Sequence, residues 1–288
     1  MLTQILLTTV IVPLLIGAAI ALIGRGNKAG NIALAALLVP VAAAIASVSI
    51  EGMPALPPIA AKHKLPVLLV IGGITFGGVS LVLKRSLHQR WIAGLIGVIS
   101  LALPAWWLGR NVLAANSMKA TTLAIVLLIV GIQLFFISDG RSRKASSAAL
   151  PAAPLATAIA TALTAILGGY IGMAQLNGAL AALFGGWMLV RYISYLRGNE
   201  DAFMLDGLAA ISFIWTAAMG VTMTTLFSPS AAPVALVLAV APIVVFAVLS
   251  KCDFSFAHQP RFLRPLIFGL LTALPAIAAI LVAVSAAG

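Results

Sequence analysis

Long apolar runs separated by short polar segments repeat along the whole chain. A helix needs about 20 apolar residues to cross roughly 30 Å of hydrocarbon, since each residue advances about 1.5 Å. Every backbone polar group must be paired inside such a segment, so the runs are predicted to be helical. Ten runs meet this length. The predicted spans are Ile5–Gly24, Gly30–Ile50, Leu65–Leu83, Trp91–Gly109, Ala120–Ser138, Ala149–Gly169, Ile171–Val190, Met204–Phe227, Ala232–Ser250 and Pro265–Ala287.

The boundary between the sixth and seventh spans is the weakest of these predictions. Only Gly168, Gly169 and Tyr170 separate the two apolar runs, and none of them is charged. A re-entrant pair in this region would reduce the number of spans to nine or eight. The sequence leaves that alternative open.

The composition agrees with a protein solvated mainly by lipid. Apolar residues make up 62% of the 288 positions and charged residues 8%, with a mean hydropathy of +1.18. Soluble domains carry about a quarter charged residues. The predicted fold class is therefore all-α, a polytopic transmembrane helix bundle forming one integral membrane domain over residues 1–288.

The basic residues predict the orientation of the bundle. Lys and Arg near span ends are retained in the cytoplasm, and here 13 of the 17 fall on one side of the predicted membrane. The other four are Lys62, Lys64, Arg110 and Lys119. This asymmetry predicts a multi-pass protein of the cytoplasmic (inner) membrane with both termini outside. The first run lacks the basic start of a signal peptide, so it is predicted to be a retained span.

Aromatic residues at span ends fit the same frame. Interfacial Trp and Tyr form belts at both membrane surfaces. The residues expected in these belts are Trp91, Trp106 and Trp107 around the fourth span, and Trp187, Tyr192 and Tyr195 at the cytoplasmic end of the seventh.

A polar linker divides the spans five and five. It comprises residues 139–147, Asp-Gly-Arg-Ser-Arg-Lys-Ala-Ser-Ser, between possible halves 1–140 and 149–288. Because five is odd, consecutive copies would insert in opposite directions, as in the inverted repeats of many secondary transporters. No residue-level similarity joins the halves, so the repeat is predicted from span number and spacing alone.

The fourth span of each half contains a proline, Pro104 and Pro242. Transporters with inverted repeats often interrupt corresponding helices, where proline frees backbone groups to meet a substrate. The alternative is that these are ordinary membrane prolines, since Pro13, Pro40 and Pro275 lie in spans without a matched partner.

Charged groups are nearly absent from the spans. All three histidines are expected in loops, outside the predicted spans, and the single cysteine, Cys252, excludes a disulfide framework within the chain. Haem ligation by two histidines within the membrane and a buried metal site are excluded as well, so no cofactor and no metal are expected. Cys252, Asp253 and His258 share one loop, but nothing supplies a fourth ligand.

Asp206 is the exception, about one helical turn inside the eighth span. It could pair with Arg191 or Arg197 or accept hydrogen bonds at the helix start, which are structural roles. Ionisable groups at depth also mark ion and substrate paths, so Asp206 remains a candidate for one.

Neutral polar side chains at depth have two interpretations. They can hold helices together, since interhelical hydrogen bonds contribute about 0.6 to 2 kcal/mol, or they can line a solute path. Gln175 and Asn177 are two residues apart, so at most one of them is expected to be central. The residues predicted to border a path are Pro104, Gln133, Gln175, Asn177, Asp206, Thr216 and Pro242.

The sequence motifs and the placement of basic residues exclude some functional classes and indicate which partners to expect. No Ser-His-Asp set, phosphate-binding loop or pair of carboxylates at depth is present, so the chain is not expected to be an enzyme. The net charge of +11 lies in short clusters between spans, which indicates membrane topology and not nucleic-acid binding. Arg261 and Arg264 in the last cytoplasmic loop are expected to meet anionic lipid headgroups or a neighbouring subunit.

Two functions remain open. The first, which the ten spans in two balanced halves favour, is a multi-pass transporter for a small neutral or weakly polar solute or lipid. The second is a non-catalytic polytopic subunit that anchors, assembles or stabilises a larger membrane complex, with homo- or hetero-oligomeric partners. A transporter should contain an aqueous cavity that reaches mid-membrane, whereas an anchoring subunit should be packed solid.

Overall fold

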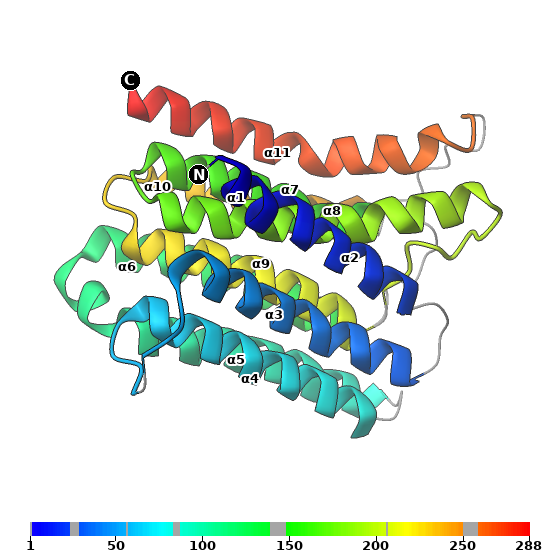
Figure 1. Cartoon of the computed structure of the whole chain (residues 1–288), viewed down its shortest axis with the longest axis horizontal. Helices are drawn as coiled ribbons and strands as arrows, with labels where there is room; N and C mark the ends of the chain where they lie inside the picture. Colours follow the sequence, from blue (N-terminus) through cyan, green and yellow to red (C-terminus); the bar gives the residue numbers. More distant parts are fainter. Residues whose placement is uncertain are drawn as a thin grey trace.

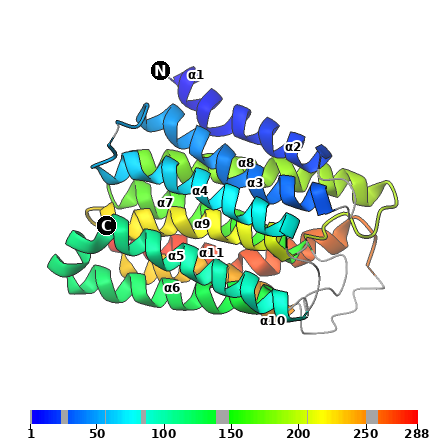
Figure 2. The ribbon, with the colours of Figure 1, turned by 90° about the horizontal axis from the view of Figure 1, so that it is seen from below.

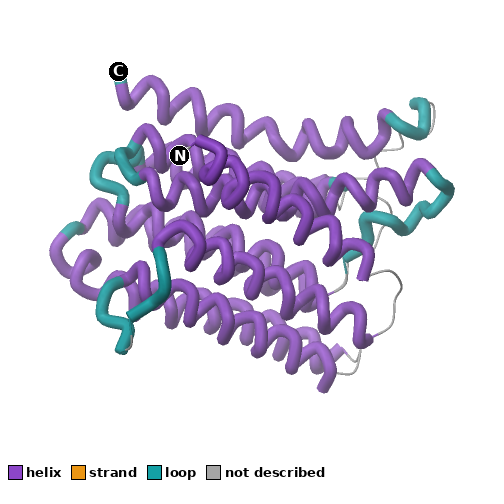
Figure 3. The backbone as a smooth tube through the Cα atoms, in the orientation of Figure 1, coloured by secondary structure: helices purple, strands orange, loops and turns teal. Residues whose placement is uncertain are grey.

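The computed structural model describes residues 2–23, 29–55, 57–82, 87–138, 148–205, 207–249 and 259–288. Throughout these residues the chain forms helices joined by loops, with no strand (Figure 3). The all-α prediction is confirmed. Asp206, the linker 139–147 and residues 250–258 of the last loop lie outside the described residues.

Each predicted span is a helix. The first is continuous but changes type: α1 (Leu2–Leu6) is followed by a π-helical segment η1 (Leu7–Ile11) and by α2 (Val12–Ile23). The other helices are α3 (Ala29–Glu51), α4 (Ala61–Val82), α5 (Leu87–Ala115), α6 (Ser117–Ser138), α7 (Ala149–Leu167), α8 (Ile171–Leu196), α9 (Gly207–Phe227), α10 (Pro233–Leu249) and α11 (Leu263–Ala287). With the first helix included, nine of the helices in the described residues are long enough to cross a membrane. The remaining helix, α10, is shorter at 17 residues, about 25 Å at helical rise.

The uncertain boundary at residues 168–170 is a tight turn between two complete helices. Gly169 has a φ of +77°, which favours glycine, and the Tyr170 N–H donates to the Ala165 carbonyl at 2.8 Å. A second bond, from the Gly169 N–H to the Ile166 carbonyl at 3.0 Å, completes a Schellman motif. The motif pairs the last carbonyls of α7 within three residues, so α7 and α8 need no polar loop between them and the re-entrant alternative is not observed.

Both termini lie at the same end of the bundle, as an even number of spans requires (Figure 1). We call this end, which also holds the α5–α6 and α7–α8 turns, the termini end. Its predicted placement outside the cell stays a prediction, as does the choice of the inner membrane. The multi-pass character and contact with a lipid bilayer follow from the helices themselves.

The helix α9 occupies the centre of the bundle (Figures 1 and 2). Every residue from Leu208 to Leu226 is buried. The helix packs against α3, α4, α5, α6, α7, α8 and α10. A helix surrounded in this way needs an apolar face in all directions, which the segment from Gly207 to Phe227 supplies.

Glycines allow several helix pairs to approach at backbone distance. A methyl group added at Gly17 of α2 would meet the Leu183 carbonyl of α8, and one added at Gly186 would meet the Leu14 carbonyl. A methyl group added at Gly73 of α4 would lie 2.8 Å from the Leu37 carbonyl oxygen of α3, a less extreme but still too close contact. These contacts explain why α2 lies along α8, and α4 along α3.

The aromatic prediction is only partly right. Trp91 and Trp106 are each 58% exposed, as expected for residues that face lipid. Trp187 is 2% exposed and belongs to the core, where its ring centroid lies 5.4 Å from that of Phe213. The interpretation of Trp187 as a lipid-facing belt residue is therefore wrong, because α9 supplies an aromatic partner for it.

The helices that stand third in the two predicted halves have different surroundings. In the first half α4 lies at the edge of the bundle, whereas in the second half α9 lies at its centre (Figure 1). The inverted repeat stays a prediction, and the two halves contribute unequally to the core.

Candidate functional site

Pro104 lies within a continuous α5. Proline has no N–H, so it cannot donate to the carbonyl four residues before it, which is the carbonyl of Ser100. In hydrocarbon that carbonyl needs another donor. The sequence predicts such a freed group, and the structure shows what binds it.

The donor is Trp215, which reaches out from the central helix α9. Its indole Nε1 donates to the Ser100 carbonyl oxygen at 3.0 Å. Gly72 of α4 makes room for the ring, since a methyl group there would collide with the indole. Phe76 contacts the same ring edge to face, with centroids 5.3 Å apart. Trp215 thus fills the space between α4 and α5 at the level of Pro104.

A second proline is compensated from the same helix. Pro40 lies within α3 and leaves the Ala36 carbonyl without its helical donor. The Ser212 hydroxyl of α9 donates to that oxygen at 2.7 Å. Ser212 and Trp215 are one helical turn apart, so one segment of α9 binds the freed carbonyls of two neighbouring helices.

The insertion of Trp215 leaves a groove beside it. We call this hollow, of about 470 Å³, the α4–α5 groove. Trp215 and Pro104 line it together with aliphatic side chains, among them Leu68 of α4. Ile71 and Leu103 on its two sides are 54% and 62% exposed, so the groove opens on the outer surface of the bundle.

One end of the groove carries a cation. Trp106 and Trp107 line the groove where α5 approaches the termini end. The Lys64 ammonium nitrogen lies 4.8 Å from the ring centroid of Trp107, a cation–π contact. The groove is therefore aliphatic and aromatic along its length and positively charged at its end.

Pro242 does not join Pro104. It is buried within α10, and α6 packs against both α5 and α10. Neither helix is broken at its proline, so the paired prolines do not form a matched interruption in the described helices.

Asn177 is fully buried in α8, against α9. Its side-chain amide donates to the Met173 carbonyl at 2.8 Å and to the Thr224 hydroxyl at 3.4 Å. Its Oδ1 has no partner among the described residues and packs against Gly220, where an added methyl group would collide with it. Gln175 is only half-buried, which agrees with the expectation that one of the two amides is central.

The remaining predicted path residues lie apart. Thr216 is buried in α9, and its hydroxyl donates to the Ser212 carbonyl at 2.7 Å. Gln133 is half-buried in α6. The placement of Asp206, and with it the proposed pairing with Arg191, lies outside the described residues.

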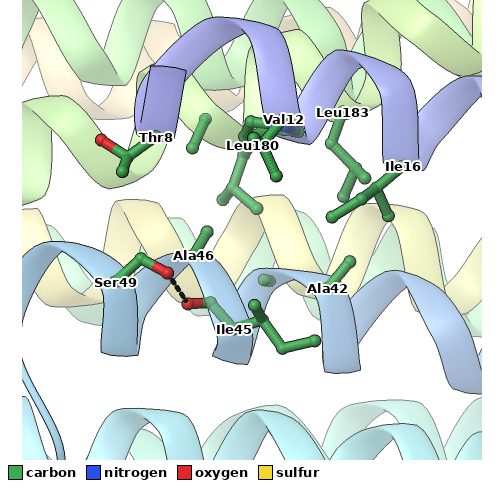
Figure 4. A pocket seen from close by; sticks show the side chains of 12 residues that line it. Thr8, Val12, Ile16, Ala42, Ile45, Ala46, Ser49, Leu180 and Leu183 are labelled. Carbon is green, nitrogen blue, oxygen red and sulfur yellow. Dashed lines mark hydrogen bonds between the residues drawn. The ribbon is translucent and has the colours of Figure 1, made fainter. Parts of the chain in front are cut away.

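A smaller cavity of about 120 Å³ lies beside the π-helical segment of the first span (Figure 4). Figure 4 shows Thr8 and Ile16 on one side and Ala42 and Ser49 of α3 on the other. The two hydroxyls donate to carbonyls of their own helices, as in the 2.8 Å bond from Ser49 to Ile45. What faces the cavity is therefore mainly hydrocarbon.

Charged groups gather at helix ends on the termini end. The Lys119 ammonium donates to the carbonyls of Leu226 and Ser228, each at 2.9 Å, where α9 ends. The Glu51 carboxylate touches Gly172 in the first turn of α8. A cation at a helix C-terminus and an anion at an N-terminus are the favourable pairings with the helix dipole.

Tyr170, in the turn before α8, has a perturbed acidity. Burial raises the pKa of its hydroxyl above the ordinary value, and the negative charge of Glu51 raises it further. The perturbation is a local property of the turn, since its causes are burial and the neighbouring Glu51.

No cluster of three metal-binding side chains occurs in the part of the chain that the structure describes. The loop with Cys252, Asp253 and His258 lies outside that part.

Comparison with protein-family models, curated proteins and solved structures finds no match for this chain.

Proposed function

We propose that this chain is a non-catalytic, multi-pass subunit that anchors or stabilises a larger protein complex in its membrane. The observation that carries the proposal is the closed centre of the bundle. The helix α9 is buried along its length by seven other helices. A solute crossing through the middle would have to displace it.

The polar groups on α9 support the same proposal. Ser212 and Trp215 bind carbonyls freed by prolines of α3 and α5. The hydroxyls of Thr216, Thr224 and Thr225 donate to carbonyls within α9 itself. These groups hold helices together, as membrane proteins commonly use buried polar residues.

Purification from native membranes in a mild detergent, followed by mass spectrometry of the intact complex, tests the proposal. We expect stoichiometric co-purification with other membrane proteins. A lone monomer or homodimer, retained after chemical cross-linking in the native membrane, would contradict it. Reconstitution of the purified chain should give liposomes no more permeable to small neutral solutes than protein-free controls.

Transport is the second candidate, and one observation favours it. The α4–α5 groove leads from the lipid-facing surface to the central helix at Trp215. A lipid-like or weakly polar solute could enter there from the side of the bundle. Movement of a labelled lipid between the leaflets of proteoliposomes would support this candidate over the first.

A further inference from the structure

The α4–α5 groove has the dimensions of one lipid chain in one leaflet. Along α5 its lining runs from Ile96 to Trp107, and 11 residues advance roughly 16 Å in a helix. This is about half of the roughly 30 Å hydrocarbon layer. Its volume of about 470 Å³ falls within the range of about 300–1,000 Å³ typical of small-molecule sites.

The walls of the groove suit a hydrocarbon chain, because the polar groups that line it are already hydrogen-bonded. Two hydroxyls line the groove, and both are engaged within their own helices: Thr75 donates to the Ile71 carbonyl at 2.8 Å and Ser100 to the Gly97 carbonyl at 2.9 Å. The Trp215 N–H is bound to the Ser100 carbonyl. A polar ligand would find no free donor there, whereas a lipid chain needs none.

Selectivity must come from the end of the groove, because moving a chain from the bilayer into the groove brings no hydrophobic gain. The half-buried Lys64 stands there, held over Trp107. Within the described residues no carboxylate forms an ion pair with it. An ammonium group has three N–H donors and a compact positive charge, which suits a phosphate oxygen.

We propose that the α4–α5 groove binds one acyl chain of a membrane phospholipid whose headgroup carries a net negative charge, with Lys64 contacting that headgroup at the termini end. The site is distinct from Arg197, Arg261 and Arg264, which lie at the opposite end of the bundle. It requires neither a partner protein nor transport, so it stands whether or not the chain is a subunit.

The test uses the full-length protein purified in detergent and given either dioleoylphosphatidylglycerol or dioleoylphosphatidylcholine. Native mass spectrometry measures how much of each lipid stays bound. For Lys64→Gln we expect phosphatidylglycerol binding to fall about fivefold, the effect of about one interfacial charge, with phosphatidylcholine little changed. The exposed Lys62, two residues away, supplies the matched control: Lys62→Gln should change binding less than twofold.

A second pair of variants tests the groove itself. Thr75→Phe fills it without removing a bond between helices, and should reduce retention of phosphatidylglycerol at least tenfold. Ile74→Phe places the same ring on the same helix at a lipid-facing position that does not line the groove, and should leave retention unchanged. If Thr75→Phe misfolds, Ile99→Phe fills the groove from α5.

Three results would overturn the proposal. The wild type could retain both lipids equally, the groove-filling variants could bind phosphatidylglycerol like the wild type, or Lys62→Gln could equal Lys64→Gln in effect. A protein segment found in the groove by cross-linking from Thr75→Cys, with no lipid retained, would also refute it and identify a docking site.

Discussion

We predict that the hydrogen bond from Trp215 to the Ser100 carbonyl stabilises the protein mainly because Pro104 leaves that carbonyl without a helical donor. Replacing Trp215 by Phe keeps an aromatic ring on Phe76 but removes the N–H that donates at 3.0 Å. The Ser100 carbonyl then has no donor. In a Pro104→Ala background the alanine N–H can bind that carbonyl within α5, so the loss of Trp215 should matter less.

The magnitude follows from the carbonyl alone. Leaving a buried acceptor unpaired costs about 1–3 kcal/mol, and interhelical hydrogen bonds in membrane proteins contribute about 0.6 kcal/mol on average and up to about 1.7. The smaller ring of Phe leaves a void in both backgrounds, and this cost cancels in a double-mutant cycle. We therefore expect a coupling free energy of about 1–2 kcal/mol between Trp215 and Pro104.

The assay is unfolding of the purified protein by steric trapping in bicelles, applied to the wild type, Trp215→Phe, Pro104→Ala and the double variant. The cycle of Ser212→Ala with Pro40→Ala should show coupling of the same sign, since Ser212 binds the Ala36 carbonyl. Trp215→Phe with Pro40→Ala shares no bond and should be additive within about 0.5 kcal/mol. Coupling below that limit in both matched cycles would refute the proposed role of α9.

Three further outcomes test the packing and the charged helix ends. Gly17→Ala should destabilise the protein by about 1–3 kcal/mol through its collision with α8. Gly78→Ala, which meets nothing, should match or exceed the wild type in thermal melts, and equal melting of the two variants would refute the close crossing. Lys119→Met should cost about 1–3 kcal/mol by freeing two carbonyls at the end of α9, whereas Lys62→Met, at an exposed position, should be neutral in the same unfolding assay. The raised pKa of Tyr170 means that its contribution to stability is complete below its unfolded pKa of about 10 and is lost as the pH rises through the folded value. Tyr170→Phe should therefore lose less stability than the wild type between pH 9 and 12, and parallel losses in the two proteins would count against the assigned shift.

The candidate site combines residues that the sequence identifies with one, Trp215, that it does not. Pro104 was identifiable because proline always frees a carbonyl, and Ser100 follows from the helical repeat. Trp215 was missed, although an indole N–H in hydrocarbon also needs a partner. Several helices carry prolines, so the sequence could not say which carbonyl the indole would bind. The groove and the role of Lys64 depend on that pairing.

The sequence by itself determined the ten helices and most of their ends. Within a span the backbone pairs with itself, so an apolar run of sufficient length specifies a helix without reference to its neighbours. The tight turn at Gly169 follows from local geometry as well.

Only the tertiary structure decided which helix lies at the centre. In soluble proteins an amphipathic stripe shows which face of a helix turns inward, but in lipid both the core and the surroundings are apolar. The helix α9 has a lower mean hydropathy, 1.5, than the lipid-facing α11, 2.6, yet both are apolar enough to span the membrane. What places α9 at the centre is the close contacts that Trp215, Ser212 and Gly220 make with specific neighbours. Those contacts depend on shape and hydrogen bonding between segments that are distant in the sequence. They cannot be inferred from the hydrophobicity of one segment alone.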